Sequence, residues 1–164
     1  MKTIANAGLA LVLTLSAAAP LLHSAPAQAQ MDEQVDPRAE KLLNDFLAAL
    51  TAQPDNMDAA VKAALPYLHK SLLAPGGADV TNDLRNFSFK KAWSNAKFYA
   101  QPVKITRIRR TGVSAIGFRE TAEKGKVTDY FVGKKDGVNG MPAPVKIFFP
   151  EGGVEPKISY VGSL

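Results

Sequence analysis

The spacing of the apolar residues changes once along this chain, and that change limits the possible fold more than any other feature. From about Asp36 to Ala100, apolar side chains recur every three or four residues, as on one face of a helix. From Val103 onward they alternate with polar residues, as on one face of a strand. Helices followed by strands are typical of the α+β class. We therefore predict about three N-terminal helices packed on a curved antiparallel sheet of four to five strands.

Each predicted helix has its own start and its own apolar stripe. Asp36 is placed to cap the first helix, and Pro37 suits its first position. Pro66 is expected to end or restart the second helix, because proline lacks an amide donor and clashes with the preceding turn. The third helix is predicted from Thr81 or Asn82 to about Ala100. The three stripes are Leu42, Leu43, Phe46, Leu47 and Leu50; Met57, Ala60, Val61, Ala64 and Leu65; and Phe89, Ala92, Trp93, Ala96 and Ala100.

The alternating region predicts five strands separated by turns. Prolines lie at the boundaries of the last two strands, where a residue without an amide donor is tolerated in a sheet. These prolines predict the limits of strands rather than a binding loop, although a functional rim loop is the alternative. The strands are 103–110, 113–121, 126–134, 145–149 and 157–161, and the prolines are Pro142, Pro144, Pro150 and Pro156.

The N-terminus has the features of a secretory signal peptide. Lys2 precedes an apolar run, and Ala27 and Ala29 form a small-residue cleavage site. We predict cleavage before Gln30, a mobile lead over 30–36, and one globular domain over 37–164. The apolar run is too short and too interrupted for a bilayer-spanning helix, which needs about 20 apolar residues. The mature chain is therefore expected in the bacterial periplasm or outside the cell, with no transmembrane segment.

Several kinds of chemistry are disfavoured by residues that the sequence lacks. It contains no cysteine, which excludes disulfides, thiol catalysis and cysteine zinc sites. His69 is the only histidine after the predicted cleavage site. The chain also lacks a phosphate-binding glycine motif and a Gly-x-Ser-x-Gly elbow. We predict no metal site and no cofactor.

Four residues are candidates for acid–base chemistry: His69, Asp129, Tyr130 and Tyr99. His69 shares the apolar face of a short predicted helix, so it is expected to be partly buried. It is interpreted as a core histidine bonded to backbone, or alternatively as a general base at a pocket wall. Asp129 lies in the middle of a predicted strand. It faces inward with Val127 and Phe131, or is solvated if Tyr130 and Val132 form the inward pair, and we favour the solvated arrangement.

Basic residues are concentrated in the second half of the chain. Residues 82–164 contain 15 basic and 7 acidic residues, whereas residues 30–81 contain 4 basic and 8 acidic ones. The 36 residues from Leu84 to Arg119 contain no acid at all. Such asymmetry indicates a surface for an anionic partner, or else a solvated or internally paired face. The anion-binding candidates are Arg107, Arg109, Arg110, Lys90 and Lys97.

The order of elements from Pro37 to Leu164 resembles that of the nuclear-transport-factor-like superfamily, which includes ketosteroid isomerase and scytalone dehydratase. That resemblance implies helices that close over a strongly curved sheet and leave a pocket between them. No catalytic motif of the superfamily aligns with this chain, so no functional residue is carried over. Because fold does not specify function, the resemblance implies a pocket and no particular activity.

These observations favour a non-enzymatic module of the cell envelope that binds a small molecule or a partner protein. One alternative is a small enzyme of the same fold, an isomerase, dehydratase or hydrolase that acts on a hydrophobic substrate. Such an enzyme requires the four acid–base candidates to meet in one cavity. Another alternative is a binder of an anionic polymer or membrane surface through the basic region 84–119. Nucleic acid is disfavoured as a partner because the chain is predicted to be exported.

Overall fold

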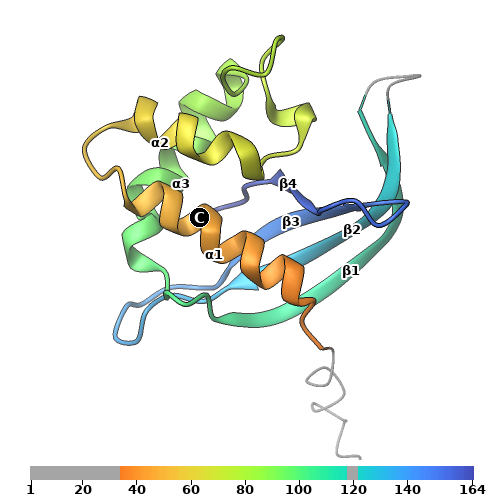
Figure 1. Cartoon of the computed structure of the whole chain (residues 1–164). Coiled ribbons are helices and arrows are strands. Elements are labelled where there is room, and N and C mark those ends of the chain that lie inside the picture. The colour runs from red at the N-terminus through yellow and green to blue at the C-terminus, as the bar shows by residue number, and fades with distance from the viewer. Residues whose placement is uncertain (1–33, 118–121) are drawn as a thin grey trace, which may run out of the picture.

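The computed structural model describes residues 34–117 and 122–164 and has α+β architecture, as predicted (Figure 1). The predicted signal peptide, most of the predicted lead and Arg119 lie outside the described residues. Helical segments come first and a four-stranded antiparallel sheet follows. The helical elements are α1 (Pro37–Thr51), α2 (Met57–Ala64), η1 (Leu65–Tyr67), η2 (Lys70–Leu72), η3 (Leu84–Phe89), α3 (Lys90–Asn95) and η4 (Ala96–Phe98). The strands are β1 (Ile105–Ile116), β2 (Glu123–Val132), β3 (Ala143–Pro150) and β4 (Lys157–Tyr160).

Helix α1 begins as its sequence predicts and lies across one face of the sheet (Figure 1). The side chain of Asp36 accepts a hydrogen bond from the main-chain N–H of Arg38, and Pro37 occupies the first turn. The five apolar residues of the predicted stripe are all buried. Burial of large apolar side chains contributes about 1.5–3 kcal/mol each, so this stripe holds α1 against the sheet.

The second and third helical segments lie close to their predicted bounds, but neither is a single regular α-helix throughout. Helix α2 ends at Ala64, and the 3-10 turn η1 follows with Pro66 inside it, consistent with the expected restart. The third helical run covers residues 82–98 without a break, close to the predicted bounds. Its hydrogen bonding changes along the run, from the π-helical segment η3 to the α-helix α3 and the 3-10 turn η4. The helical run stops before Tyr99, because Tyr99 forms a β-bridge with Lys134 at the edge of the strands.

The sheet has the order β1-β2-β3-β4, with every neighbouring pair antiparallel. The first two predicted strands are one strand, β1, and the turn expected between them is absent. Gly112, at a φ of 96°, accommodates a bulge between Arg110 and Gly112, so the ladder with β2 continues past it. The sheet accordingly has four strands, within the predicted range.

The closing segment of the chain confirms the assignment of its prolines to strand boundaries. Pro144 and Pro150 lie at the two ends of β3, and Pro156 directly precedes β4. Beside β4, Leu68 forms a parallel bridge with Ile158, so the chain before η2 covers part of that edge. None of the described helices is long and apolar enough to cross a membrane.

The core lies between the helical layer and one face of the sheet. Tyr130 and Val132 on β2 belong to it, as do Val145 and Ile147 on β3. Trp93, predicted to be buried, is only partly so: its indole N–H donates to the carbonyl of Gln53 at 2.7 Å. Phe89 takes the central aromatic position instead and is fully buried.

Replacing Phe89 with alanine is expected to lower the free energy of unfolding by about 3–5 kcal/mol, as for other large core aromatics. Phe87 is the matched control, because it lies two residues away on the same segment and is 72% exposed. Phe87→Ala should change the free energy by no more than about 0.5 kcal/mol. Urea titration of both variants measures the difference, and equal losses would contradict this assignment of the core.

Candidate functional site

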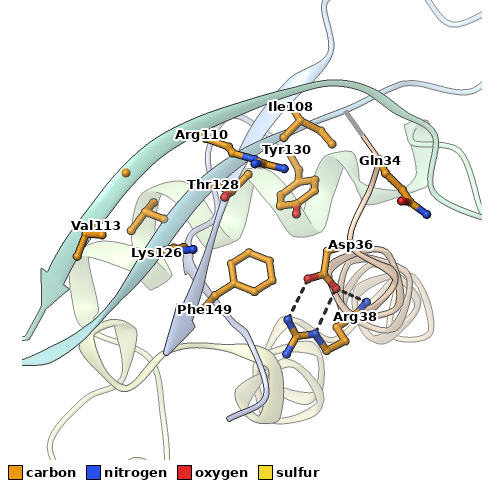
Figure 2. Close-up of a pocket in the computed structure, with 12 residues that line it drawn as sticks. Gln34, Asp36, Arg38, Ile108, Arg110, Val113, Lys126, Thr128, Tyr130 and Phe149 are labelled. Atoms are coloured by element: carbon orange, nitrogen blue, oxygen red, sulfur yellow. Dashed lines mark hydrogen bonds and ion pairs between the residues drawn. The ribbon is translucent and has the colours of Figure 1, made fainter. Parts of the chain in front are cut away.

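A groove opens between the start of α1 and the helix-facing side of the sheet (Figure 2). Its volume is about 460 Å³, which falls within the range of about 300–1,000 Å³ common for small-molecule sites. The helix contributes its N-terminal residues, and three strands contribute the floor. The lining residues are Gln34, Asp36, Arg38, Ile108, Arg110, Gly112, Val113, Lys126, Val127, Thr128, Tyr130 and Phe149.

The register of the strands places the floor residues on one face. Ile108 pairs with Tyr130, and Arg110 pairs with Thr128. Beyond the bulge, Val113 pairs with Lys126. Side chains of directly paired residues share a face of the sheet. The extra residue of the bulge shifts the alternation by one, so that Val113 follows Arg110 onto the groove side.

One wall of the groove is aromatic. The rings of Tyr130 and Phe149 lie 6.5 Å apart between centroids, tilted by 45°. In Figure 2 the ring of Tyr130 points from β2 into the groove, with Phe149 beside it. Aromatic side chains offer a large apolar contact area, and the Tyr130 hydroxyl adds a polar group at the same place.

The charged groups of the lining are predominantly basic. Arg38, Arg110 and Lys126 contribute three cations, while Asp36 contributes one carboxylate. Asp36 is already engaged: the guanidinium of Arg38 donates to both of its carboxylate oxygens, at 3.2 and 2.9 Å. The hydrogen bond from Arg38 holds the pKa of Asp36 below its usual value. The Arg38 guanidinium also lies 5.6 Å from the centre of the Phe149 ring, so it joins the charged and aromatic parts of the wall.

A second cavity continues this groove toward the turn after β3. It has a volume of about 270 Å³ and includes Glu151 and Gly153 from that turn. Four residues line both cavities: Arg38, Val113, Lys126 and Phe149. The two cavities therefore form one elongated depression along the sheet.

Asp129 is buried, and the prediction that it is solvated is wrong. Tyr130 and Val132 do face the helices, as that prediction assumed, and Asp129 points to the opposite face. Asp129 is nevertheless only 1% exposed, because Arg109 covers it from the neighbouring strand. The Nε and Nη2 atoms of Arg109 both donate to Oδ2 of Asp129, the former at 2.9 Å. Asp129 thus balances a charge on the far side of the sheet and does not enter the groove.

The four acid–base candidates do not meet in one place. Tyr130 lines the groove, and Asp129 lies on the other face of the sheet. Tyr99 is buried near the end of the chain, where its hydroxyl donates to the carbonyl of Ser163 at 3.4 Å. His69 is 2% exposed, more deeply buried than predicted, and its Nδ1 accepts a hydrogen bond from the main-chain N–H of Ser71. These four residues therefore do not form one shared catalytic site.

The five anion-binding candidates are also divided among different surfaces. Arg107 and Arg109 share one face of β1, and Arg110 lies on the groove face, as the strand alternation predicts. The Arg107 guanidinium stacks 3.8 Å from the centre of the Phe131 ring. Lys90 and Lys97 are exposed on α3 and η4 in the helical layer. Only Arg110 among the five contributes to the groove.

Sequence reasoning missed three contributors to the groove. Neither Arg38 nor Phe149 is a site candidate in the sequence, and Lys126 appears there only as the first residue of a predicted strand. In the structure Arg38 lies in the first turn of α1, Phe149 next to the end of β3 and Lys126 in the first half of β2. The three residues meet only once the sheet and α1 are packed. Among the described residues, no cluster of three histidines or carboxylates is placed to hold a metal ion.

No family model, no curated protein and no solved structure matches the chain. Its function is therefore inferred from the geometry and chemistry of its own residues.

The stability of the fold is expected to depend on pH through His69. Burial is the main cause that lowers the pKa of His69 below 6.5, while Glu123 opposes and Lys70 assists the shift. His69 therefore binds a proton more readily in the unfolded chain than in the folded chain. The free energy of unfolding accordingly falls as the pH drops below about 6.5. Urea titration at pH 7.5 and pH 5.5 should show a lower midpoint at the lower pH.

The His69→Gln variant is the control for this pH dependence, because it removes the titrating group. Its midpoint should change less between the two pH values than that of the unmodified chain. Glu123 does not interfere, because Lys70 lowers its pKa below 4.5 and its titration lies beneath this window. An equal pH dependence in both proteins would show that another group is responsible.

Proposed function

We propose that the groove binds a small organic anion with an aromatic or otherwise apolar body. The observation that carries this proposal is the meeting of Tyr130 and Phe149 with three cations in one cavity. Ligand sites typically combine an apolar lining with a few polar groups that fix orientation. The basic groups attract the charged end of such a ligand, and the aromatic wall contacts its body.

The groove is better suited to binding than to catalysis. The described residues around Tyr130 and Phe149 include no histidine, and the one carboxylate among them, Asp36, is occupied by Arg38 and by the cap of α1. Glu151 lies in the continuation of the depression, at the exposed turn after β3. General acid–base catalysis needs a group free to exchange a proton with the substrate. We therefore propose a binding module rather than an isomerase or dehydratase.

Two sequence features set this proposal in context. The resemblance to nuclear-transport-factor-like proteins implies a pocket between helices and sheet, which is where this groove lies. The predicted signal peptide supports a location of the binding module in the bacterial envelope or outside the cell. A soluble metabolite or an envelope component that carries a carboxylate, sulfonate or phosphate fits both features.

Binding of 8-anilinonaphthalene-1-sulfonate tests the proposal, because this fluorescent probe joins an aromatic body to an anion. The unmodified chain should bind the probe saturably at low salt, and Arg110→Ala should weaken binding about tenfold, as expected for the loss of one charged hydrogen bond. Added salt should weaken binding further. Fluorescence titration gives the dissociation constants.

Two matched pairs of variants assign the binding to the groove. Arg107→Ala removes an arginine from the same strand but the opposite face, and it should bind like the unmodified chain. Val113→Glu places a negative charge in the groove and should abolish binding, whereas Met141→Glu, at another exposed apolar residue, should not. Equal affinities within either pair, or no saturable binding by the unmodified chain, would refute the proposal.

A further inference from the structure

Three polar side chains from two distant segments form a hydrogen-bonded chain where β2 begins. The Oγ of Ser71 lies 2.8 Å from Nδ1 of His69. The Nε2 of the same ring lies 3.4 Å from Oε2 of Glu123, which is 54 positions away in the sequence. The resulting order is hydroxyl, imidazole, carboxylate, which is the order required to activate a serine nucleophile.

The tautomer of His69 follows from its partners. The main-chain N–H of Ser71 donates to Nδ1 at 3.2 Å, so Nδ1 of the neutral ring carries a lone pair and no proton. The proton of the neutral ring is therefore on Nε2, where it points to the Glu123 carboxylate. Nδ1 is consequently the atom that can accept the hydroxyl proton of Ser71.

His69 is held rigidly in this orientation. Its main-chain N–H donates to the carbonyl of Ile158 at 2.8 Å, and its carbonyl accepts from Leu72 at 2.9 Å. Its ring contacts Phe148 edge-on, at 5.1 Å between centroids. Burial lowers the pKa of His69, which keeps the ring neutral and able to act as a base at neutral pH. Glu123 stays ionised, because the adjacent Lys70 ammonium lowers its pKa.

Ser71 opens onto a cleft that can hold a substrate. The residue is exposed, unlike the histidine behind it. The cleft has a volume of about 420 Å³, and Leu73, Ala74 and Pro75 give it an apolar wall. It shares no lining residue with the groove beside α1. This site is therefore separate from the one assigned to anion binding.

We propose that Ser71 is the nucleophile of an esterase site, with His69 as its general base and Glu123 as the residue that positions this base. The cleft fits an ester with a small apolar acyl group. This activity lies beyond the proposed binding function and does not depend on it.

The proposed reaction proceeds in two halves. Oγ of Ser71 bonds to the ester carbonyl carbon while its proton passes to Nδ1 of His69, and the bond to the leaving alcohol breaks as Nδ1 returns the proton to it. Water then attacks the acyl-serine, again giving its proton to Nδ1, and the proton returns to Oγ as the carboxylic acid leaves. The net reaction is ester and water to acid and alcohol.

A fluorophosphonate probe tests the nucleophile without knowledge of the natural ester. Attack by Oγ on the phosphorus forms an O–P bond and expels fluoride. Mass spectrometry then detects the phosphonate adduct on the peptide that contains Ser71. The unmodified chain should be labelled at this residue at pH 8. Ser71→Ala should lose the adduct while keeping its unfolding midpoint, because the alanine retains the main-chain N–H that caps His69.

Three further variants separate a catalytic role from a structural one. His69→Gln should slow labelling at least about a hundredfold, as expected for the loss of a general base. Ser94→Ala is the control, because Ser94 is an exposed serine on α3 whose hydroxyl bonds to the Lys90 carbonyl. It should be labelled at Ser71 like the unmodified chain.

Glu123→Gln should shift the pH midpoint of labelling downward, because Glu123 raises the pKa of His69 against burial and against Lys70. Absence of a Ser71 adduct on the unmodified chain would overturn the proposal. An unchanged labelling rate in folded His69→Gln would do the same. An unchanged pH midpoint in Glu123→Gln would remove the role given to that residue.

Discussion

The packing of α1 on the sheet forms the core of the domain and sets the position of the groove. Its stripe of leucines and Phe46 covers the face formed by Tyr130, Val132, Val145 and Ile147. Helix α1 starts at Pro37, because the Asp36 cap fixes that end. Strands β1 and β2 extend beyond this start (Figure 1), and the groove lies there. The groove is thus a consequence of a helix that is shorter than the sheet surface it covers.

The far face of the sheet is covered in a different way. Arg109 lies over Asp129, and Arg107 stacks on Phe131. The long side chains of these two arginines cover apolar and charged residues of the far face, in place of a second layer of helices. The arrangement explains why a strand buried on both sides carries a carboxylate. Arg107 and Arg109 thus contact residues of the far face, whereas Arg110 lies on the groove face. The charge surplus of the second half of the chain therefore does not form one continuous surface from the five candidate cations.

The region where β2 begins depends on contacts between distant segments. Glu123 begins β2, whereas His69 and Ser71 belong to the segment that runs beside β4. Gly125, two residues after Glu123, has no room for a side chain, since an added Cβ would lie 2.3 Å from the carbonyl oxygen of Phe149 and 2.6 Å from the Phe148 ring. The same Phe148 ring contacts His69. Close packing around Phe148 therefore fixes both the hairpin and the histidine.

Four features follow from the sequence alone: the order of the elements, the capped start of α1, the buried stripe of that helix and the prolines that bound the last strands. These features depend on local spacing and on backbone chemistry, which act within a few residues. Tertiary packing, in contrast, sets the bulge at Gly112 inside one long strand, because the ladder with β2 continues past it. It also decided that Asp129 is buried and that Ser71, His69 and Glu123 meet. Those outcomes depend on which side chains of neighbouring segments contact a residue. The alternation of residues along one strand does not show how that strand is paired with the next one.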